Sequence, residues 1–166
     1  MKAKIFQLEP VKKDEYKDSG YRLLNSFSFD DRMVFPDPTM IDWWSDAEDI
    51  KGSFSKLVSD LPNGMFVVNE DEMSLTYVMR PDNYIQEYLD KIKEKANDLT
   101  IENLYSYKVS LLEMETLIKQ GCCDDMCYSC NDGYPYYFNH WIIDVAMFDE
   151  IGTKYYLGGV LDYHSW

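Results

Sequence analysis

Apolar residues recur at helical spacing in three segments of the chain. The first begins with the capping sequence of residues 45–48, Ser-Asp-Ala-Glu, in which the serine and the glutamate can each bind a free backbone amide of the other. Pro62-Asn63-Gly64 then provides a stop signal. The apolar positions between them are Ala47, Ile50, Phe54, Leu57, Val58 and Leu61. This pattern predicts an amphipathic helix over residues 45–61.

Two further helices are predicted in the middle of the chain. One opens after Pro81, and its charged residues fall opposite a single apolar face made of Ile85, Tyr88, Leu89, Ile92, Ala96 and Leu99. The other starts at a second capping sequence, residues 110–113, and ends at Gly121, since glycine is a frequent C-terminal cap. A continuous helix over residues 100–120 is the alternative for this region.

Alternating or β-rich runs predict the strands. Residues 2–9 form an opening strand that ends at Pro10, and residues 11–40 read as mostly irregular. The predicted strands after this segment are residues 65–69 and 73–80, joined by an acidic turn, then 104–109, and finally a hairpin of 138–148 and 154–163 around 150–153. Gly158 and Gly159 lie inside the last of these strands and indicate a bulge or close packing.

These elements predict an α+β protein of one domain, residues 1–166, with an antiparallel sheet, about three helices and a cysteine-rich loop at 121–133. A chain of 166 residues can bury a core of its own without staples.

The balance of charge limits the class of partner. Thirty Asp and Glu against sixteen Lys and Arg give a net charge of -14. Such a protein repels phosphate backbones, so we expect no direct nucleic-acid binding, whereas a basic protein surface would be attracted. Solubility alone is an alternative explanation of the acidity.

All four cysteines lie within nine residues, at positions 122, 123, 127 and 130. The chain shows no secretory h-region and no membrane-spanning run, so we expect a cytoplasmic protein with reduced thiols, which favours metal over disulfides. The short spacing of Cys127 and Cys130 predicts a structural zinc site with Cys123, Cys127 and Cys130 as ligands. Cys122 or His140 would be the fourth ligand, and Asp124 or Asp125 could substitute for it. The candidate ligands are Cys122, Cys123, Cys127, Cys130 and His140. The alternatives for the cysteines are free thiols or a disulfide. The alternative for His140 is a half-buried side chain, at the start of a predicted strand, that binds no metal.

Two aromatic stretches next to acids are candidate recognition surfaces, because aromatic residues often dominate the binding energy of interfaces. The residues concerned are Asp42, Trp43, Trp44, Asp46, Asp49, Tyr134, Tyr136 and Tyr137. Packing of the same aromatic side chains at the margin of the core is the alternative.

A compact, strongly acidic chain without a catalytic motif resembles the small inhibitors encoded by phages and mobile elements, including anti-CRISPR proteins. The resemblance covers the whole chain as a profile, and no motif assigns a role to any residue. It implies inhibition of a nucleic-acid enzyme in a bacterial cell, above all a Cas9-like effector with positively charged channels. The alternatives are an immunity protein that neutralises a toxin and a zinc-dependent enzyme that uses the cysteine cluster.

Overall fold

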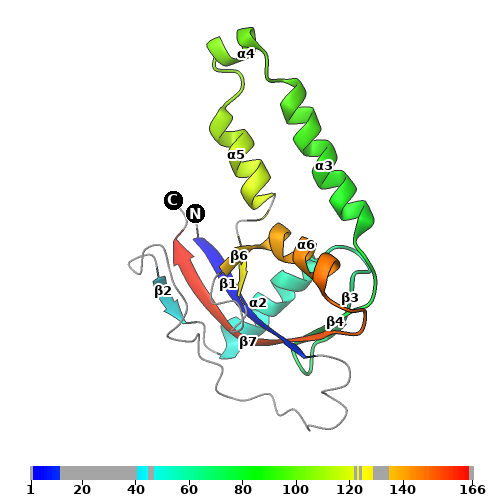
Figure 1. Cartoon of the computed structure of the whole chain (residues 1–166). Coiled ribbons are helices and arrows are strands. Elements are labelled where there is room, and N and C mark those ends of the chain that lie inside the picture. Colours follow the sequence, from blue (N-terminus) through cyan, green and yellow to red (C-terminus); the bar gives the residue numbers. More distant parts are fainter. Residues whose placement is uncertain are drawn as a thin grey trace.

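The computed structural model describes residues 2–11, 41–44, 47–121, 123, 125–128 and 135–164. Within them lie seven strands in one sheet and five helices (Figure 1). The predicted α+β class is confirmed. The sheet is mixed, however, where an antiparallel one was expected, and the helices number five in these ranges where about three were predicted.

The strands are β1 (Lys2–Val11), β2 (Ile41–Trp44), β3 (Phe66–Asn69), β4 (Ser74–Tyr77), β5 (Met126–Tyr128), β6 (Pro135–Tyr137) and β7 (Lys154–His164). The helices are α2 (Ala47–Asp60), α3 (Asp82–Asn97), α4 (Ile101–Tyr105), α5 (Leu111–Gln120) and α6 (Phe138–Phe148). Strands β1, β3, β4 and β7 and helices α2, α3 and α5 thus confirm their sequence predictions, with Pro10 inside β1 rather than at its end. The capping serine at position 45 and residues 12–40 lie outside the described ranges.

Strand β7 is the centre of the sheet. It pairs antiparallel with β1 along one edge, while β4 and β2 share its other edge. Gln7 lies opposite Gly159 and Leu8 opposite Leu157, so Gly158 is the extra residue of a bulge. The bulge predicted from the glycine pair is therefore confirmed, and it raises the local twist of the two longest strands.

One parallel pair makes the sheet mixed. Strand β5 runs parallel to β1, with Phe6 opposite Cys127, and β6 then pairs antiparallel with β5. Both β5 and β6 are only three residues long, and β5 belongs to the cysteine-rich segment, where no alternating pattern marks a strand. The predicted antiparallel sheet is wrong at this point. The β1–β5 pairing joins segments about 120 residues apart, and local sequence patterns carry no information about such a pairing.

Helices α2 and α6 cover one face of the sheet and form the core with it. Phe54 and Leu57 of α2 are buried, and so are four apolar residues of α6 at helical spacing: Phe138, Trp141, Ile142 and Val145. The ring of Trp141 stacks on Phe66 of β3 at a centroid distance of 5.5 Å. The predicted strand over 138–148 is therefore wrong, because this spacing buries one face of a helix, and the turn at 150–153 joins α6 to β7 rather than two strands.

The predicted strand over residues 104–109 is also wrong. This segment begins inside the short helix α4, which starts where the Thr100 side chain accepts a hydrogen bond from the Asn103 backbone amide at 3.1 Å. The chain then turns before the Ser110 hydroxyl caps α5 by accepting from the Glu113 amide. The alternative of one continuous helix is wrong for the same reason.

Helices α3, α4 and α5 form an arm that projects from the rest of the structure (Figure 1). We call residues 82–121 the arm and the sheet with α2 and α6 the body. No residue of α3 is buried. At the base of the arm, α5 ends at Gly121, whose φ of 67° lies in the left-handed region that glycine adopts without strain. Among the described helices, none combines the length and the apolar character needed to cross a bilayer.

Candidate functional site

The buried carboxylate of Asp125 ties the cysteine-rich segment to the body. It is 2% exposed, and its Oδ1 accepts a hydrogen bond from the Lys4 backbone amide at 2.8 Å. Its Oδ2 lies 2.5 Å from the Lys56 ammonium group, which comes from α2. A buried carboxylate is stable only when its oxygens find such partners. Asp125 therefore holds β1, α2 and the segment before β5 together.

Cys123 and Asp60 complete a cluster around this carboxylate. One donor atom from each of Asp60, Cys123 and Asp125 lies within 4.8 Å of the other two. Burial raises the pKa of the Cys123 thiol to about 11, and the nearby carboxylates of Asp125 and Asp60 add to the effect. Burial likewise raises the pKa of the Cys127 thiol, and the nearby Cys123 and Asp125 raise it further. Both thiols are therefore protonated at neutral pH unless a cation replaces their protons.

The cluster differs from the ligand set expected from the sequence. Cys123 and Cys127 are described as free thiols, while Cys122 and Cys130 lie outside the described ranges. His140 sits on helix α6, not on a strand, and its ring packs edge-on against Tyr137 at 6.1 Å. Among described residues, the three-membered group of possible metal ligands contains neither His140 nor Cys127 but does contain Asp60. Sequence reasoning missed Asp60, which is 63 positions before Cys123 and joins it only through the fold.

The aromatic and acidic residues predicted for recognition are only partly described. The backbone of residues 42–44 lies in β2 and that of Asp49 in α2, but their side chains are outside the described part, as are Asp46 and Tyr134. Tyr136 and Tyr137 lie in β6 and are half-buried, and Tyr136 packs against the core. For Tyr136, the alternative of packing at the core margin is thus confirmed.

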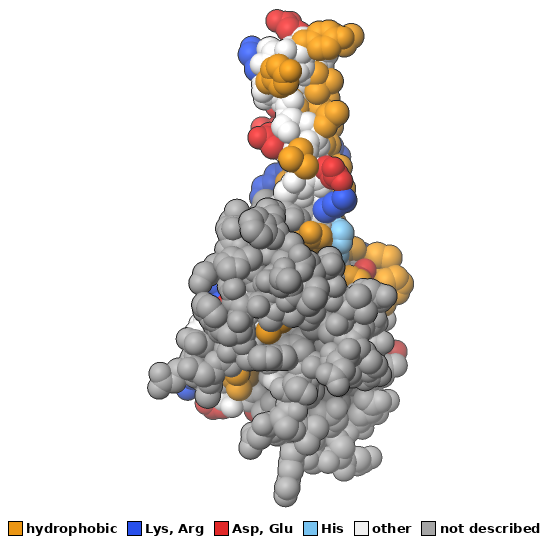
Figure 2. All heavy atoms as spheres, turned by 90° about the vertical axis from the view of Figure 1, so that its left-hand side faces the viewer, with side chains coloured by type: hydrophobic (Ala, Val, Ile, Leu, Met, Phe, Trp, Pro, Cys, Tyr) orange, Lys and Arg blue, Asp and Glu red, His pale blue; other side chains and the backbone are white. Residues whose placement is uncertain are grey.

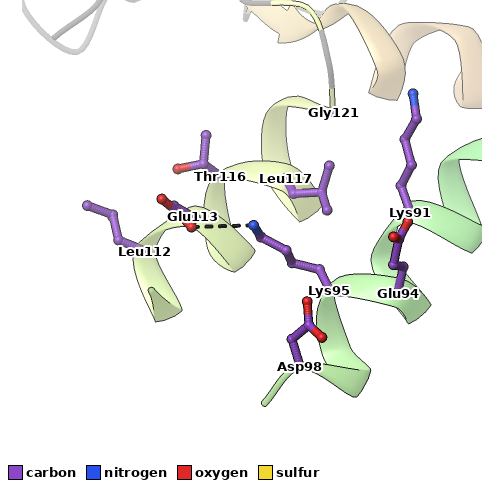
Figure 3. A pocket seen from close by; sticks show the side chains of 9 residues that line it. All are labelled: Lys91, Glu94, Lys95, Asp98, Leu112, Glu113, Thr116, Leu117 and Gly121. Carbon is purple, nitrogen blue, oxygen red and sulfur yellow. Dashed lines mark ion pairs between the residues drawn. The ribbon is translucent and has the colours of Figure 1, made fainter. Parts of the chain in front are cut away.

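An open groove separates the two long helices of the arm (Figure 3). Its volume is about 640 Å³, and charged side chains of α3 contribute much of its lining. The lining residues are Lys91, Glu94, Lys95, Asp98, Leu112, Glu113, Thr116, Leu117 and Gly121. The ion pair between Lys95 and Glu113, at 3.4 Å, spans the gap between α3 and α5. Polar and charged side chains thus make up most of the groove lining, and this ion pair bridges it.

Large apolar side chains are exposed towards the tip of the arm. Tyr105 is 83% exposed and Tyr107 94%, and Ile101, Leu111 and Leu112 are exposed beside them. Tyr107 also has a φ of 56°, in a region that costs a non-glycine residue energy. Figure 2 shows hydrophobic side chains along one edge of the arm. Exposed apolar groups in such number are uncommon on a protein surface and are frequent where proteins contact other molecules.

Negative charge is spread over the arm and the rest of the chain nearly in proportion to their lengths, so most of it lies outside the shorter arm. The arm contains eight acidic residues and five lysines, a net charge of -3, so the rest of the chain carries -11 of the total of -14. Three lysines of the body are engaged internally: Lys4 pairs with Asp162 at 2.7 Å, Lys56 with Asp125, and Lys154 with Glu72. Lys51 is exposed on α2 and forms no ion pair with a described residue. The exposed acids Asp60, Glu70, Asp71 and Glu150 form no ion pair with any described residue.

Comparisons with known proteins found no relative of this chain. No family model matches it, and neither a curated protein nor a solved structure matches it significantly.

Proposed function

We propose that this protein acts by binding a basic protein surface and inhibiting its partner without catalysis, and that the partner is a nucleic-acid enzyme such as a Cas9-like effector. The observation that carries the proposal is the uncompensated charge of the body. Three of its lysines, Lys4, Lys56 and Lys154, are neutralised by internal pairs, while the exposed acids Glu70 and Asp71 form no ion pair with a described residue. A net charge of this size steers a protein towards a basic groove and raises the rate of association.

The first experiment measures association with candidate nucleases at several salt concentrations, together with the stoichiometry of inhibition. We expect one-to-one inhibition and an association rate that falls as salt screens the charges. Turnover of the partner at substoichiometric amounts of this protein would contradict the proposal and favour an enzyme. Inhibition of a toxin but of none of the nucleases would favour an immunity protein instead.

A pair of variants with equal change in charge sharpens this experiment. Reversal of Glu70 and Asp71 to lysine, in the exposed turn between β3 and β4, should slow association strongly. The same reversal at Glu87 and Glu102, which are exposed on the arm, changes the total charge equally but leaves the body acidic. Equal slowing by both pairs would show that total charge, and not the surface of the body, governs binding.

We also propose that the cysteine-rich segment holds a structural zinc ion, with Cys123 as a ligand. The cluster supplies one sulfur and two carboxylate donors, which are ligand types that zinc accepts. Both oxygens of Asp125 already accept hydrogen bonds, so a zinc ion bound there would displace Lys56, whose side chain is half exposed and can swing into solvent.

Elemental analysis of the purified protein tests the zinc proposal, and about one ion per chain is expected for a structural site. Cys123→Ser should remove the ion, and it is a cleaner variant than one at Cys127, which is buried in the core. Lys56→Met should retain zinc or bind it more tightly, because it removes the competing cation. Protein grown with ample zinc that contains none would eliminate the proposal.

A further inference from the structure

We infer that two copies of this chain associate through their arms, which pack antiparallel into a four-helix bundle. This inference is independent of the partner proposed above and concerns the arm rather than the acidic body. It starts from α3, in which no residue is buried although a third of its positions are apolar.

Helix α3 carries an apolar seam that the rest of the chain covers only in part. The seam consists of Ile85, Leu89, Ile92, Ala96 and, just beyond the end of the helix, Leu99, which alternate at spacings of four and three residues. Leu89 and Ala96 are exposed, and the other three are half-buried. This is the spacing by which helices pack side by side in bundles and coiled coils. The residues of α3 that line the groove towards α5, such as Lys91 and Lys95, lie on the neighbouring strip. Leu89, in the middle of the seam, is 42% exposed.

Helix α5 presents a similar seam next to that of α3. Leu111, Met114 and Ile118 follow one another at three and four residues, and Ile118 is 45% exposed. The Tyr88 hydroxyl donates a hydrogen bond to the Ile118 carbonyl, which places the lower parts of the two helices side by side. The arm is thus a layer of two helices with an apolar face, which agrees with the apolar edge in Figure 2. Such a layer becomes stable when a second layer covers it.

The distribution of charge favours a second copy as that layer. Two copies carry -28 together, twice the -14 of one chain, so a contact between bodies would meet strong repulsion. The arm, at -3, is the part with the least repulsion. Because the arm projects from one side of the body (Figure 1), antiparallel arms place the two acidic bodies at opposite ends of the bundle. The 16 residues of α3 span about 24 Å, which is beyond the screening length of ~8 Å at physiological salt.

A two-fold axis between Ile92 and Lys93 places Leu89 of one copy opposite Ala96 of the other, so a large residue packs against a small one along the seam. The charged residues that line the groove towards α5, such as Lys91, Glu94 and Lys95, lie away from the seam and stay outside this contact.

The exposed apolar residues of the arm are sufficient for a stable contact. A standard interface buries ~800 Å² per partner, and a buried aromatic side chain supplies ~150–250 Å², so Tyr105 and Tyr107 provide about half of the area. The aliphatic residues that supply the rest are Leu89, Ile101, Leu111, Leu112 and Ile118. In the antiparallel arrangement the tip of each arm reaches the base of the other, where Met147 and Phe148 of α6 are exposed in the body.

Sedimentation and light scattering over a wide range of protein concentration test the inference. The native chain should have twice its single-chain mass of 19.6 kDa at high concentration and dissociate on dilution. Leu89→Lys should give a monomer at every concentration, while Asn83→Lys, an equal change in charge at an exposed position of α3 away from the seam, should remain a dimer. Circular dichroism of both variants confirms that they are folded. A native chain that is monomeric throughout, or a dimer that Leu89→Lys leaves intact, would overturn the inference.

Cross-linking tests the direction of the arms. In a mixture of Leu89→Cys and Ala96→Cys proteins, oxidation should join position 89 of one copy to position 96 of the other, identified by mass spectrometry of the linked peptides. Links between two copies of position 89 would overturn the antiparallel arrangement. Failure to bind a nuclease would affect only the proposed function, since neither readout here involves one.

Discussion

The body and the arm differ in how far they bury their apolar side chains. In the body, α2 and α6 close over the sheet and bury residues such as Phe6, Leu57 and Ile142 almost completely. In the arm, two long helices face each other across a groove lined mostly by polar side chains, and no residue of α3 is fully buried. The body therefore closes over its own apolar residues, whereas the arm leaves an apolar face exposed, the face that we propose a second copy covers.

Matched leucine variants test this difference most strongly. Leu57→Ala in α2 should lower the free energy of unfolding by about 3 kcal/mol, because it leaves a cavity in the core. Leu89→Ala in α3, measured on dilute monomer, should lower it by less than about 1 kcal/mol, because much of this side chain is already in water. Urea unfolding followed by circular dichroism measures both values. Similar losses for the two variants would mean that the arm buries its seam within one copy.

Two acidic residues allow the same comparison for polar contacts. Asp125→Ala should cost about 2 kcal/mol, because it leaves the buried Lys4 amide without an acceptor and removes the partner of Lys56. Glu115→Ala in α5 removes the fully exposed pair with Lys119, and no measurable change in the unfolding midpoint is expected. If Asp125→Ala were as stable as the native chain, the carboxylate would not be the connection between β1 and α2 that its contacts indicate.

Glycine variants compare the junction of the two regions with the body. Gly121→Ala should destabilise by about 1–2 kcal/mol, because φ is positive there and the new Cβ would lie 3.1 Å from Asn139. Gly52→Ala, inside α2 with nothing within 4 Å, should stabilise by about 0.5–1 kcal/mol. Thermal unfolding gives the sign of each change. Two changes of the same sign would contradict the assigned backbone conformation.

Alkylation of Cys123 should produce the smallest effect, one of rate and not of stability. Only the thiolate reacts, and burial raises the pKa of this thiol to about 11, so in protein freed of metal by a chelator its reaction with iodoacetamide should remain slow at pH 8 and accelerate towards pH 11. Peptide mapping by mass spectrometry follows the site separately from the other cysteines. A rate that levels off near pH 9 would show an ordinary exposed thiol. A rate that stays low at high pH until a chelator is added would support bound zinc.

Local signals in the sequence were sufficient for much of the fold. The capping serine at 110, the glycine at 121 and the stop after residue 61 predicted helix ends that the structure has. The apolar residues at positions 138, 141, 142 and 145 have helical spacing, and the segment is a helix. Its many aromatic and β-branched residues also have a high propensity for strands, and the strand prediction was based on this propensity. The Thr100 cap was likewise present in the sequence before α4 and was outweighed by alternating tyrosines.

Long-range contacts could not be predicted in this way. The parallel pairing of β1 with β5 and the approach of Asp60 to Cys123 join positions that share no local pattern. The apolar face of α3 was predicted correctly from its period, but period alone does not tell whether a face is covered by the same chain. The projection of the arm and the exposure of Leu89 show that part of this face is left uncovered by the described chain.

The central place of β7 determines when this protein can fold. Strand β1 is made early by the ribosome, but its antiparallel partner follows some 140 residues later. At ~5–20 residues per second, β1 waits roughly 7–30 s for that partner, with Ile5, Phe6 and Leu8 exposed to chaperones and to other nascent chains. Strands β2 and β4 must wait for the same segment. Contacts within the arm join nearer positions, such as Tyr88 and Ile118, 30 residues apart, so α3 and α5 can meet on the ribosome while the sheet is still incomplete.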